Sequence, residues 1–231
     1  MSNSFAKTAA ALTLCLVAST VQADLVLGLS FDDLTTSKTV TSGSSVFVDL
    51  FLTDTDGSTP LTSDGLLTGG GAIDVTAGTA GVGHVATTAA LGWDAATLVS
   101  PVLGAPGIAS VLVNAPTIPF PPFVFPVGIG ATVVQIARFE LAITGAAGET
   151  ATISSEVLGG IFTGNQSLDT TDLSALPVDL DALLTGTGSV DVTIAGAAAA
   201  VPEASTLLVA GLLGVGVLYR RRRKPNAAAR A

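Results

Sequence analysis

The chain is poor in cysteine, in tyrosine and tryptophan, and in positive charge outside its C-terminal tail. One of its 231 residues is cysteine, one is tyrosine and one is tryptophan. Cys15 lies in an N-terminal segment that we expect to be removed, so we expect no disulfide, thiol nucleophile or thiolate metal site in the mature chain. A secreted domain without disulfides must be stabilised by buried apolar side chains, and residues 24–196 are long enough to form such a core.

Charge is spread unevenly along the chain. Residues 24–202 contain seventeen acidic residues and two basic ones, Lys38 and Arg138, for a net charge of −15. Residues 203–231 carry a net charge of +5. A strongly acidic surface is repelled by phosphate backbones and anionic lipid, so we expect no nucleic-acid partner.

The N-terminus has the three parts of a secretory signal peptide. Lys7 supplies the positive n-region, and residues 9–20 form an apolar stretch too short to span a bilayer comfortably. Val21 and Ala23 place small or modest side chains at the two positions that a signal peptidase reads. We therefore predict a signal peptide at residues 1–23, cleavage after Ala23, and export of the rest.

Residues 24–196 show short runs of alternating polarity and no long helical period. In residues 45–53 the alternation puts one set of apolar side chains on a single face: Val46, Val48, Leu50 and Leu52. Further strands are expected at residues 25–31, 150–157 and 188–194.

Residues 133–143 alternate in the same way. One face is predicted to point to the core and carries Gln135, Ala137, Phe139, Leu141 and Ile143. The other face carries Val134, Ile136, Arg138 and Glu140.

Glycine-rich segments separate these runs, at residues 54–57, 69–71, 145–148 and 159–160, and we expect them to be turns. Short strands with glycine-rich turns are typical of an antiparallel β-sandwich. We therefore predict an all-β sandwich of the jelly-roll type at residues 24–196, with one short helix at residues 167–176.

A proline-rich segment interrupts the pattern at residues 116–126, PTIPFPPFVFP. Proline has no N–H for a sheet ladder, so this segment is expected to be a loop or edge of polyproline character. Two interpretations remain open: a strap over the sandwich with its phenylalanines buried, or an exposed docking strip.

The C-terminal tail, residues 197–231, combines three features. Val201, Pro202 and Glu203 precede an apolar segment, residues 204–219. As a helix these 16 residues would span about 24 Å, slightly less than a hydrocarbon core. A basic block follows, made of Arg220, Arg221, Arg222, Arg223 and Lys224. Positive charge stays on the cytoplasmic side, so the tail predicts a single C-terminal transmembrane helix with the body outside.

This order of motif, apolar helix and arginine cluster resembles the PEP-CTERM sorting signal. The resemblance implies that an exosortase, a membrane transpeptidase, cuts the chain near Pro202 and Glu203, so that the membrane is a transient partner. The family pattern continues with a second proline, where this chain has Ala204. A plain membrane anchor is the alternative.

The body is similar to cohesin-like sandwiches in the order and spacing of its segments. The segments concerned are SGSSVFVDLFLTD, GGAIDVTAG, LGWDAATLVSPV and VVQIARFELAITGAAGETATISSEV. The resemblance implies a sandwich fold; the dockerin partner of cohesins is not carried over, because no residue here supports it.

Few residues suggest chemistry. Asp54, Asp56 and Asp64 bracket a loop in which carboxylates could converge on calcium, the only cofactor considered, although the register departs from an EF-hand and a solvated turn is the alternative. Trp93 could be a ligand platform or a core side chain. His84 has no partners that the sequence marks, and no catalytic motif is present, so we expect no enzyme.

These observations predict a cell-surface or extracellular protein of a Gram-negative-type bacterium. Its expected role is structural or adhesive, in an exopolysaccharide or biofilm matrix, with extracellular polysaccharide as a partner. The alternatives are a membrane-anchored module that binds carbohydrate or protein and, third, a secreted hydrolase.

Overall fold

The structure is a computed structural model that describes residues 25–119, 122–158, 164–167 and 177–196. The predicted signal peptide, most of the predicted helix at residues 167–176 and the whole sorting tail lie outside these ranges. The one predicted helical residue inside them, Ser167, belongs to a strand.

The described residues are almost entirely strands. They form β1 (Leu25–Phe31), β2 (Ser37–Val40), β3 (Ser44–Asp54), α1 (Pro60–Asp64), β4 (Leu66–Gly78), β5 (Gly81–Ala89), β6 (Asp94–Val99), β7 (Ala109–Asn114), β8 (Thr117–Pro119), β9 (Pro122–Val124), β10 (Val133–Thr144), β11 (Thr150–Glu156), β12 (Gln166–Ser167), β13 (Val178–Asp179), the 3₁₀ turn η1 (Asp181–Leu183), β14 (Leu184–Thr187) and β15 (Ser189–Ile194).

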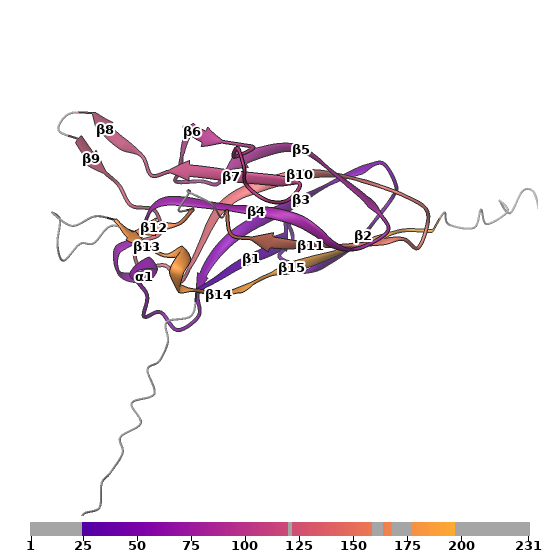
Figure 1. The fold of residues 1–231 in the computed structure, drawn as a ribbon, viewed down its shortest axis with the longest axis horizontal. Coiled ribbons are helices and arrows are strands. Elements are labelled where there is room, and N and C mark those ends of the chain that lie inside the picture. Colours follow the sequence, from indigo (N-terminus) through magenta and orange to yellow (C-terminus); the bar gives the residue numbers. More distant parts are fainter. Residues whose placement is uncertain (1–24, 120–121, 159–163, 168–176, 197–231) are drawn as a thin grey trace, which may run out of the picture.

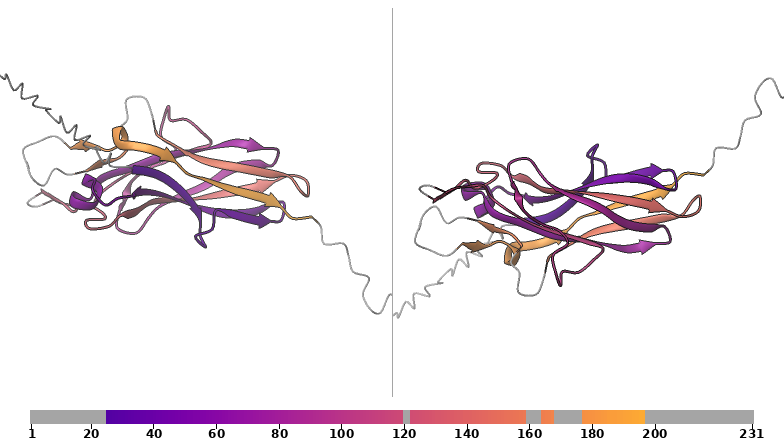
Figure 2. Two further views of the ribbon diagram at one scale, coloured as in Figure 1. Left: turned by 90° about the horizontal axis from the view of Figure 1, so that it is seen from below. Right: turned by 90° about the horizontal axis from the view of Figure 1, so that it is seen from above.

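Two sheets pack face to face, as Figures 1 and 2 show from three sides. The first has the strand order β14-β1-β3-β10-β5. The second has the order β13-β12-β4-β11-β15-β2, with β7 also paired to β4 and β6 to β7. The predicted β-sandwich is thus confirmed. Its ladders are antiparallel except at two places, where β1 pairs with β14 and β2 pairs with β15 in parallel.

The core lies between the sheets and consists mainly of aliphatic side chains, with two phenylalanines and Trp93. On β3 the predicted inward face is confirmed, since Val46, Val48, Leu50 and Leu52 are at most 2% exposed. Phe31 and Phe139 are fully buried beside them. Each such side chain contributes about 1.5–3 kcal/mol on burial, which is how a domain without disulfides is stabilised.

The predicted faces of β10 are right over only part of its length. Val134 and Ile136 were assigned to the outer face, but they are 5% and 0% exposed. A bulge between Gln135 and Ala137 inserts Ile136 as an extra residue opposite β3. The bulge shifts the alternation by one position, so residues on both sides of it point inward.

The glycine triplet at residues 69–71 is not a turn but the middle of β4. A Cβ on Gly69 would lie 2.8 Å from the ring of Trp93, and one on Gly70 would lie 2.9 Å from Leu158. These glycines therefore make room for side chains that pack across the strand.

The proline-rich segment contributes a two-stranded hairpin, β8 with β9, which is not part of either main sheet. Figure 1 shows it projecting at one end of the sandwich, so the predicted strap over a sheet is wrong for its described residues. Val124 and Phe125 are 43% and 52% exposed, as the docking-strip interpretation requires.

Candidate functional site

The predicted sorting residues follow the last strand of the sandwich in sequence. β15 is an interior strand, paired with β11 on one side and β2 on the other. The described chain ends two residues after this strand, at Gly196. Val201, Pro202, Glu203, the basic block from Arg220 to Lys224, and Ala23 all lie outside the described residues.

The loop after β3 is organised around the carboxylate of Asp54, which is 2% exposed. Its Oδ1 accepts hydrogen bonds from the backbone N–H of Gly57 at 2.8 Å and of Asp56 at 3.4 Å. Its Oδ2 accepts from the N–H and the hydroxyl of Thr59, at 2.9 and 2.7 Å, and from the hydroxyl of Thr62 at 2.8 Å. Asp54 thus joins the loop to the first turn of α1.

Burial by itself would raise the pKa of Asp54. The hydrogen bonds from the Thr59 and Thr62 hydroxyls and from the backbone of Thr59 and Gly57 outweigh burial, and they hold the pKa well below its ordinary value. The carboxylate is therefore ionised at neutral pH, and hydrogen-bond donors from its own loop and α1 stabilise its charge.

The other two candidate calcium ligands are used differently. Asp56 accepts hydrogen bonds from the N–H and hydroxyl of Ser58, and Asp64 lies 9% exposed at the end of α1. Among the described residues, no three His, Cys, Asp or Glu side chains are grouped as a metal ion would require. This geometry gives the calcium expectation no support, and calcium stays an untested prediction.

Trp93 is a core side chain. It is 7% exposed, and its indole Nε1 donates a hydrogen bond to the carbonyl of Gln135 at 2.9 Å. Its ring packs against the backbone of Gly69. No open ring face is left for a ligand, so the predicted ligand role is wrong and the core alternative is right.

A charged pair that the sequence analysis did not single out lies on the outer face of the first sheet. Arg138 on β10 donates from Nε to Asp49 Oδ1 at 2.6 Å and from Nη2 to Asp49 Oδ2 at 2.8 Å. Asp49 lies opposite on β3 and is 3% exposed. The guanidinium also lies over the ring of Phe47, 5.9 Å from its centroid. Asp49 thereby fixes the direction of Arg138, while 41% of the arginine side chain remains in solvent.

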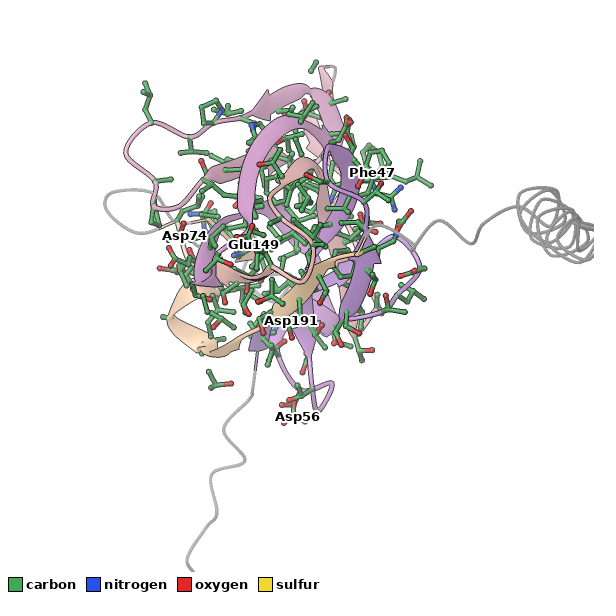
Figure 3. The ribbon with its side chains drawn as sticks, turned by 90° about the vertical axis from the view of Figure 1, so that its right-hand side faces the viewer. Phe47, Asp56, Asp74, Glu149 and Asp191 are labelled. Carbon is green, nitrogen blue, oxygen red and sulfur yellow. The ribbon has the colours of Figure 1, made fainter. Side chains whose placement is uncertain are left out.

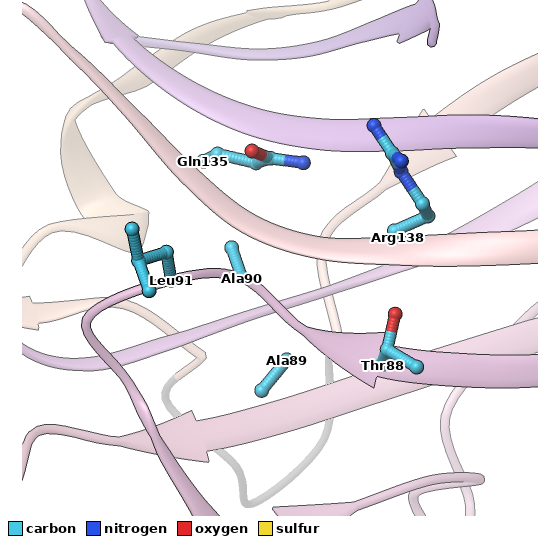
Figure 4. A pocket seen from close by; sticks show the side chains of 6 residues that line it. All are labelled: Thr88, Ala89, Ala90, Leu91, Gln135 and Arg138. Atoms are coloured by element: carbon cyan, nitrogen blue, oxygen red, sulfur yellow. The ribbon is translucent and has the colours of Figure 1, made fainter.

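Beside Arg138 lies a pocket of about 250 Å³, shown in Figure 4. It is lined by Thr88, Ala89, Ala90, Leu91, Gln135 and Arg138. The pocket combines small side chains, one amide and one oriented guanidinium, which suits recognition of a polar group more than acid–base chemistry. It is the candidate binding site of the described body.

His84 and the buried Asn165 have structural partners. His84 Nε2 lies 2.8 Å from the Thr87 hydroxyl, and its ring meets Phe139 edge-on. The Asn165 amide is 1% exposed, exchanges hydrogen bonds with the backbone of Gly70 and donates to Asp181 at 2.7 Å. Neither arrangement brings together the groups of a catalytic site.

No helix among the described residues has the length and apolar character to cross a bilayer. The predicted span at residues 204–219 lies beyond the described part of the chain.

The tail and the body of the chain match different kinds of known protein. Residues 200–224 match the PEP-CTERM protein-sorting motif, in agreement with the predicted motif, apolar segment and basic block. No curated protein matches the chain.

Among solved structures, the body is similar to cohesin modules. One is the seventh ScaB type I cohesin of Pseudobacteroides cellulosolvens, with 13% identity over 77% of this chain and 94% of that one and a TM-score of 0.45. Another is a cohesin module from a Clostridium perfringens family 33 glycoside hydrolase, with 11% identity, 74% and 98% coverage and a TM-score of 0.44. The chain thus consists of an all-β sandwich that resembles cohesin modules, followed by a PEP-CTERM sorting motif. This motif marks an exported protein processed by an exosortase.

Proposed function

We propose that this protein is a structural or adhesive component of an extracellular polysaccharide matrix. In this proposal its C-terminal helix holds it in the inner membrane briefly, before an exosortase-type transpeptidase cuts near Pro202 and Glu203. The body is then released or joined to the cell surface. The single observation that carries the proposal is the sorting motif at residues 200–224, directly after a folded sandwich.

The position of the cut is compatible with an intact body. The hydrophobic core cluster of the described residues runs from Leu25 to Ile194, so a cut at residue 202 removes no part of it. Residues 195–201, if extended, reach about 23 Å from the end of β15. A membrane enzyme could therefore reach the junction while the sandwich stays folded.

The charge of the separated parts also supports a matrix role. A cut after Pro202 leaves a body of net charge −15 and discards the basic block. Such a body stays soluble and is repelled by anionic membrane lipid, so it is free to enter a hydrated matrix.

The processing step is tested by mass spectrometry of the mature protein from its host. We expect a C-terminus near residues 202–203 in the wild type, and retention of the basic block after Pro202→Ala, because the motif is altered. Pro225→Ala, the same change just beyond the motif, is the matched control and should be processed normally. A wild-type product that retains residues 220–224 would contradict the sorting proposal.

The matrix role is tested separately, with the purified body and polysaccharide extracted from the host matrix. Co-sedimentation of the two, and loss of matrix cohesion in a strain that lacks the protein, are the expected results. Normal cohesion in that strain would overturn the structural role while leaving the sorting step untouched.

A binding module is the second candidate, favoured by the oriented Arg138 beside its pocket. Glycan arrays with the purified body test it, comparing wild type with Phe47→Ala, which removes the ring beside Arg138, and with Leu91→Ser in the pocket lining. A ligand whose binding is lost in these variants supports the candidate, and the absence of any bound glycan refutes a carbohydrate-binding role.

A further inference from the structure

One long stretch of the acidic body is almost free of charge. Between Val75 and Ala137 the only charged residue is Asp94. The remaining sixteen acidic residues of residues 24–202 lie before or after this stretch. The charge of the body is therefore confined to part of its chain.

The same stretch holds most of the exposed large apolar side chains among the described residues. Eight of the ten most exposed large hydrophobic side chains among the described residues lie within it: Val85, Leu91, Val99, Leu103, Val124, Phe125, Ile129 and Val133. Leu91 is fully exposed and Leu103 is 88% exposed. Apolar side chains gathered where charge is missing are typical of a surface that another molecule covers.

Four of these side chains belong to neighbouring elements. Val85 lies on β5 and Val99 on β6, while Leu91 and Leu103 lie in the loops that follow these two strands. The Ser100 hydroxyl donates to the Thr87 hydroxyl at 2.9 Å and so joins the end of β6 to β5. We call the surface of β5, the end of β6 at Val99 and these two loops the uncharged face; Asp94, at the start of β6, is not part of it.

The uncharged face lies away from several of the acidic side chains. In Figure 1, β5 and β6 occupy the top of the sandwich. Figure 3 keeps the same vertical direction and shows Asp56 and Asp191 in the lower half, with Asp74 and Glu149 near mid-height.

The uncharged face also contains an open sheet edge. β5 is the outer strand of the first sheet, nine residues long, with neither charge nor proline in its sequence GVGHVATTA. The outer strands β14 and β2 have four residues each, and β2 carries Lys38. A bulge at Val85 divides β5 and leaves regular stretches on both sides of it. Unpaired edges without charge or proline are the ones that proteins associate through.

We propose that the uncharged face binds the same face of a second copy of this chain in a two-fold symmetric dimer. A second copy is the occupant that the charge distribution fits. Two bodies of net charge −15 repel each other, but pairing through this face puts several of their acidic side chains far apart. Screening over about 8 Å at physiological salt then removes most of the repulsion. A two-fold axis makes one patch sufficient for both partners.

The proposal is tested by sedimentation equilibrium on residues 24–201, which contain the whole described core. Leu91→Asp introduces a charge into the uncharged face, and the two-fold axis brings the two new charges to the same interface. Leu34→Asp is the matched control, because Leu34 is 77% exposed in the turn between β1 and β2, beside Asp32 and Asp33.

We expect dimers for the wild type and for Leu34→Asp, and a dissociation constant raised at least about tenfold by Leu91→Asp, equivalent to about 1.4 kcal/mol. A monomeric wild type, or equal weakening by the two variants, overturns the proposal. Equal urea unfolding midpoints of the two variants show that the effect is on association and not on folding.

A second measurement uses the full-length chain in its host, where Cys15 is the only natural cysteine. A flexible bifunctional thiol reagent should cross-link two copies of Leu91→Cys, whose thiols lie at one interface, and should not cross-link Leu34→Cys. Equal cross-linking of the two, or of neither, contradicts the dimer. The outcome does not depend on whether the tail is cut.

Discussion

Asp54 offers the sharpest test of how the described body is stabilised. The change is Asp54→Ala, which removes an acceptor of five hydrogen bonds in the loop after β3. Donors near the surface can bind water instead. Thr59 is 1% exposed, so its N–H and hydroxyl stay unsatisfied. Each buried unsatisfied donor costs about 1–3 kcal/mol, and the loss of a hydrogen bond to a charged group costs a similar amount. We expect a total loss of about 3–5 kcal/mol in the free energy of unfolding.

The assay is urea unfolding of residues 24–201, followed by the fluorescence of Trp93. This is the only tryptophan of the chain and is 7% exposed, so its emission should shift on unfolding. Asp56→Ala is the matched control in the same loop. Its exposed carboxylate holds only Ser58 among the described residues, and its loss should cost about 1 kcal/mol or less. If the two variants lose equal stability, the reasoning about Asp54 is wrong.

The pH dependence of stability, with a second substitution at the same position, adds an independent check. The folded-state pKa of Asp54 is lowered, so its contribution is fully present above the unfolded pKa of about 3.9 and is lost as the pH falls below that value. We expect the difference in stability between wild type and Asp54→Asn to be constant near neutral pH and to shrink below about pH 4. A difference that stays constant through the acid range would contradict the assigned cause of the pKa shift.

Two further predictions concern packing and the outer charged pair. Gly69→Ala should lower the free energy of unfolding by about 1–3 kcal/mol, because its Cβ would lie 2.8 Å from the Trp93 ring, whereas Gly83→Ala, with nothing within 4 Å, should cost less than about 1 kcal/mol. Arg138→Gln should cost about 1–3 kcal/mol, because Asp49 loses both hydrogen bonds of the pair. Asp49→Asn combined with Arg138→Gln should cost less than the sum of the two single changes, and additive costs would show that the pair is not coupled.

The sandwich could be predicted from the sequence because strand periodicity is local. Residues 45–53 alternate with period two along an unbroken strand, and their inward side chains are the ones expected. The faces of β10 could not be predicted throughout, because the bulge at Ile136 depends on its register against β3. An extra residue in one strand has no signature in that strand alone.

A run of glycines can mark either a turn or a strand that other side chains approach closely, and the sequence does not distinguish the two. Glycine frees the backbone, so the sequence predicts a turn at residues 69–71, whereas in the structure glycine avoids side chains that would collide with Trp93 and Leu158. The colliding groups come from distant positions in the chain, so no local rule identifies them.

The candidate sites also differ in how far the sequence predicts them. The sorting motif could be predicted because it is read as a linear sequence, in order and at fixed spacing. The Asp49–Arg138 pair required the register of two strands, although opposite charges in the middle of two apolar runs were an available signal. Asp54 was recognised as a loop carboxylate, but the sequence alone did not show whether its partners would be a cation or its own loop donors.

The two parallel strand pairs bear on the time at which the proposed cut would occur relative to folding. β1 pairs with β14 and β2 with β15, so the first strands of the body acquire these neighbours only when residues up to Ile194 have been exported. Only seven residues separate Ile194 from Pro202. A chain cut as soon as its junction emerged would leave the membrane before these long-range pairs had formed, with strand edges open to aggregation. Under the proposed route, the membrane helix keeps the newest strands close to the exit site while the oldest strands pair with them. Retention before cleavage would then favour completion of both sheets, in addition to addressing the protein to the surface.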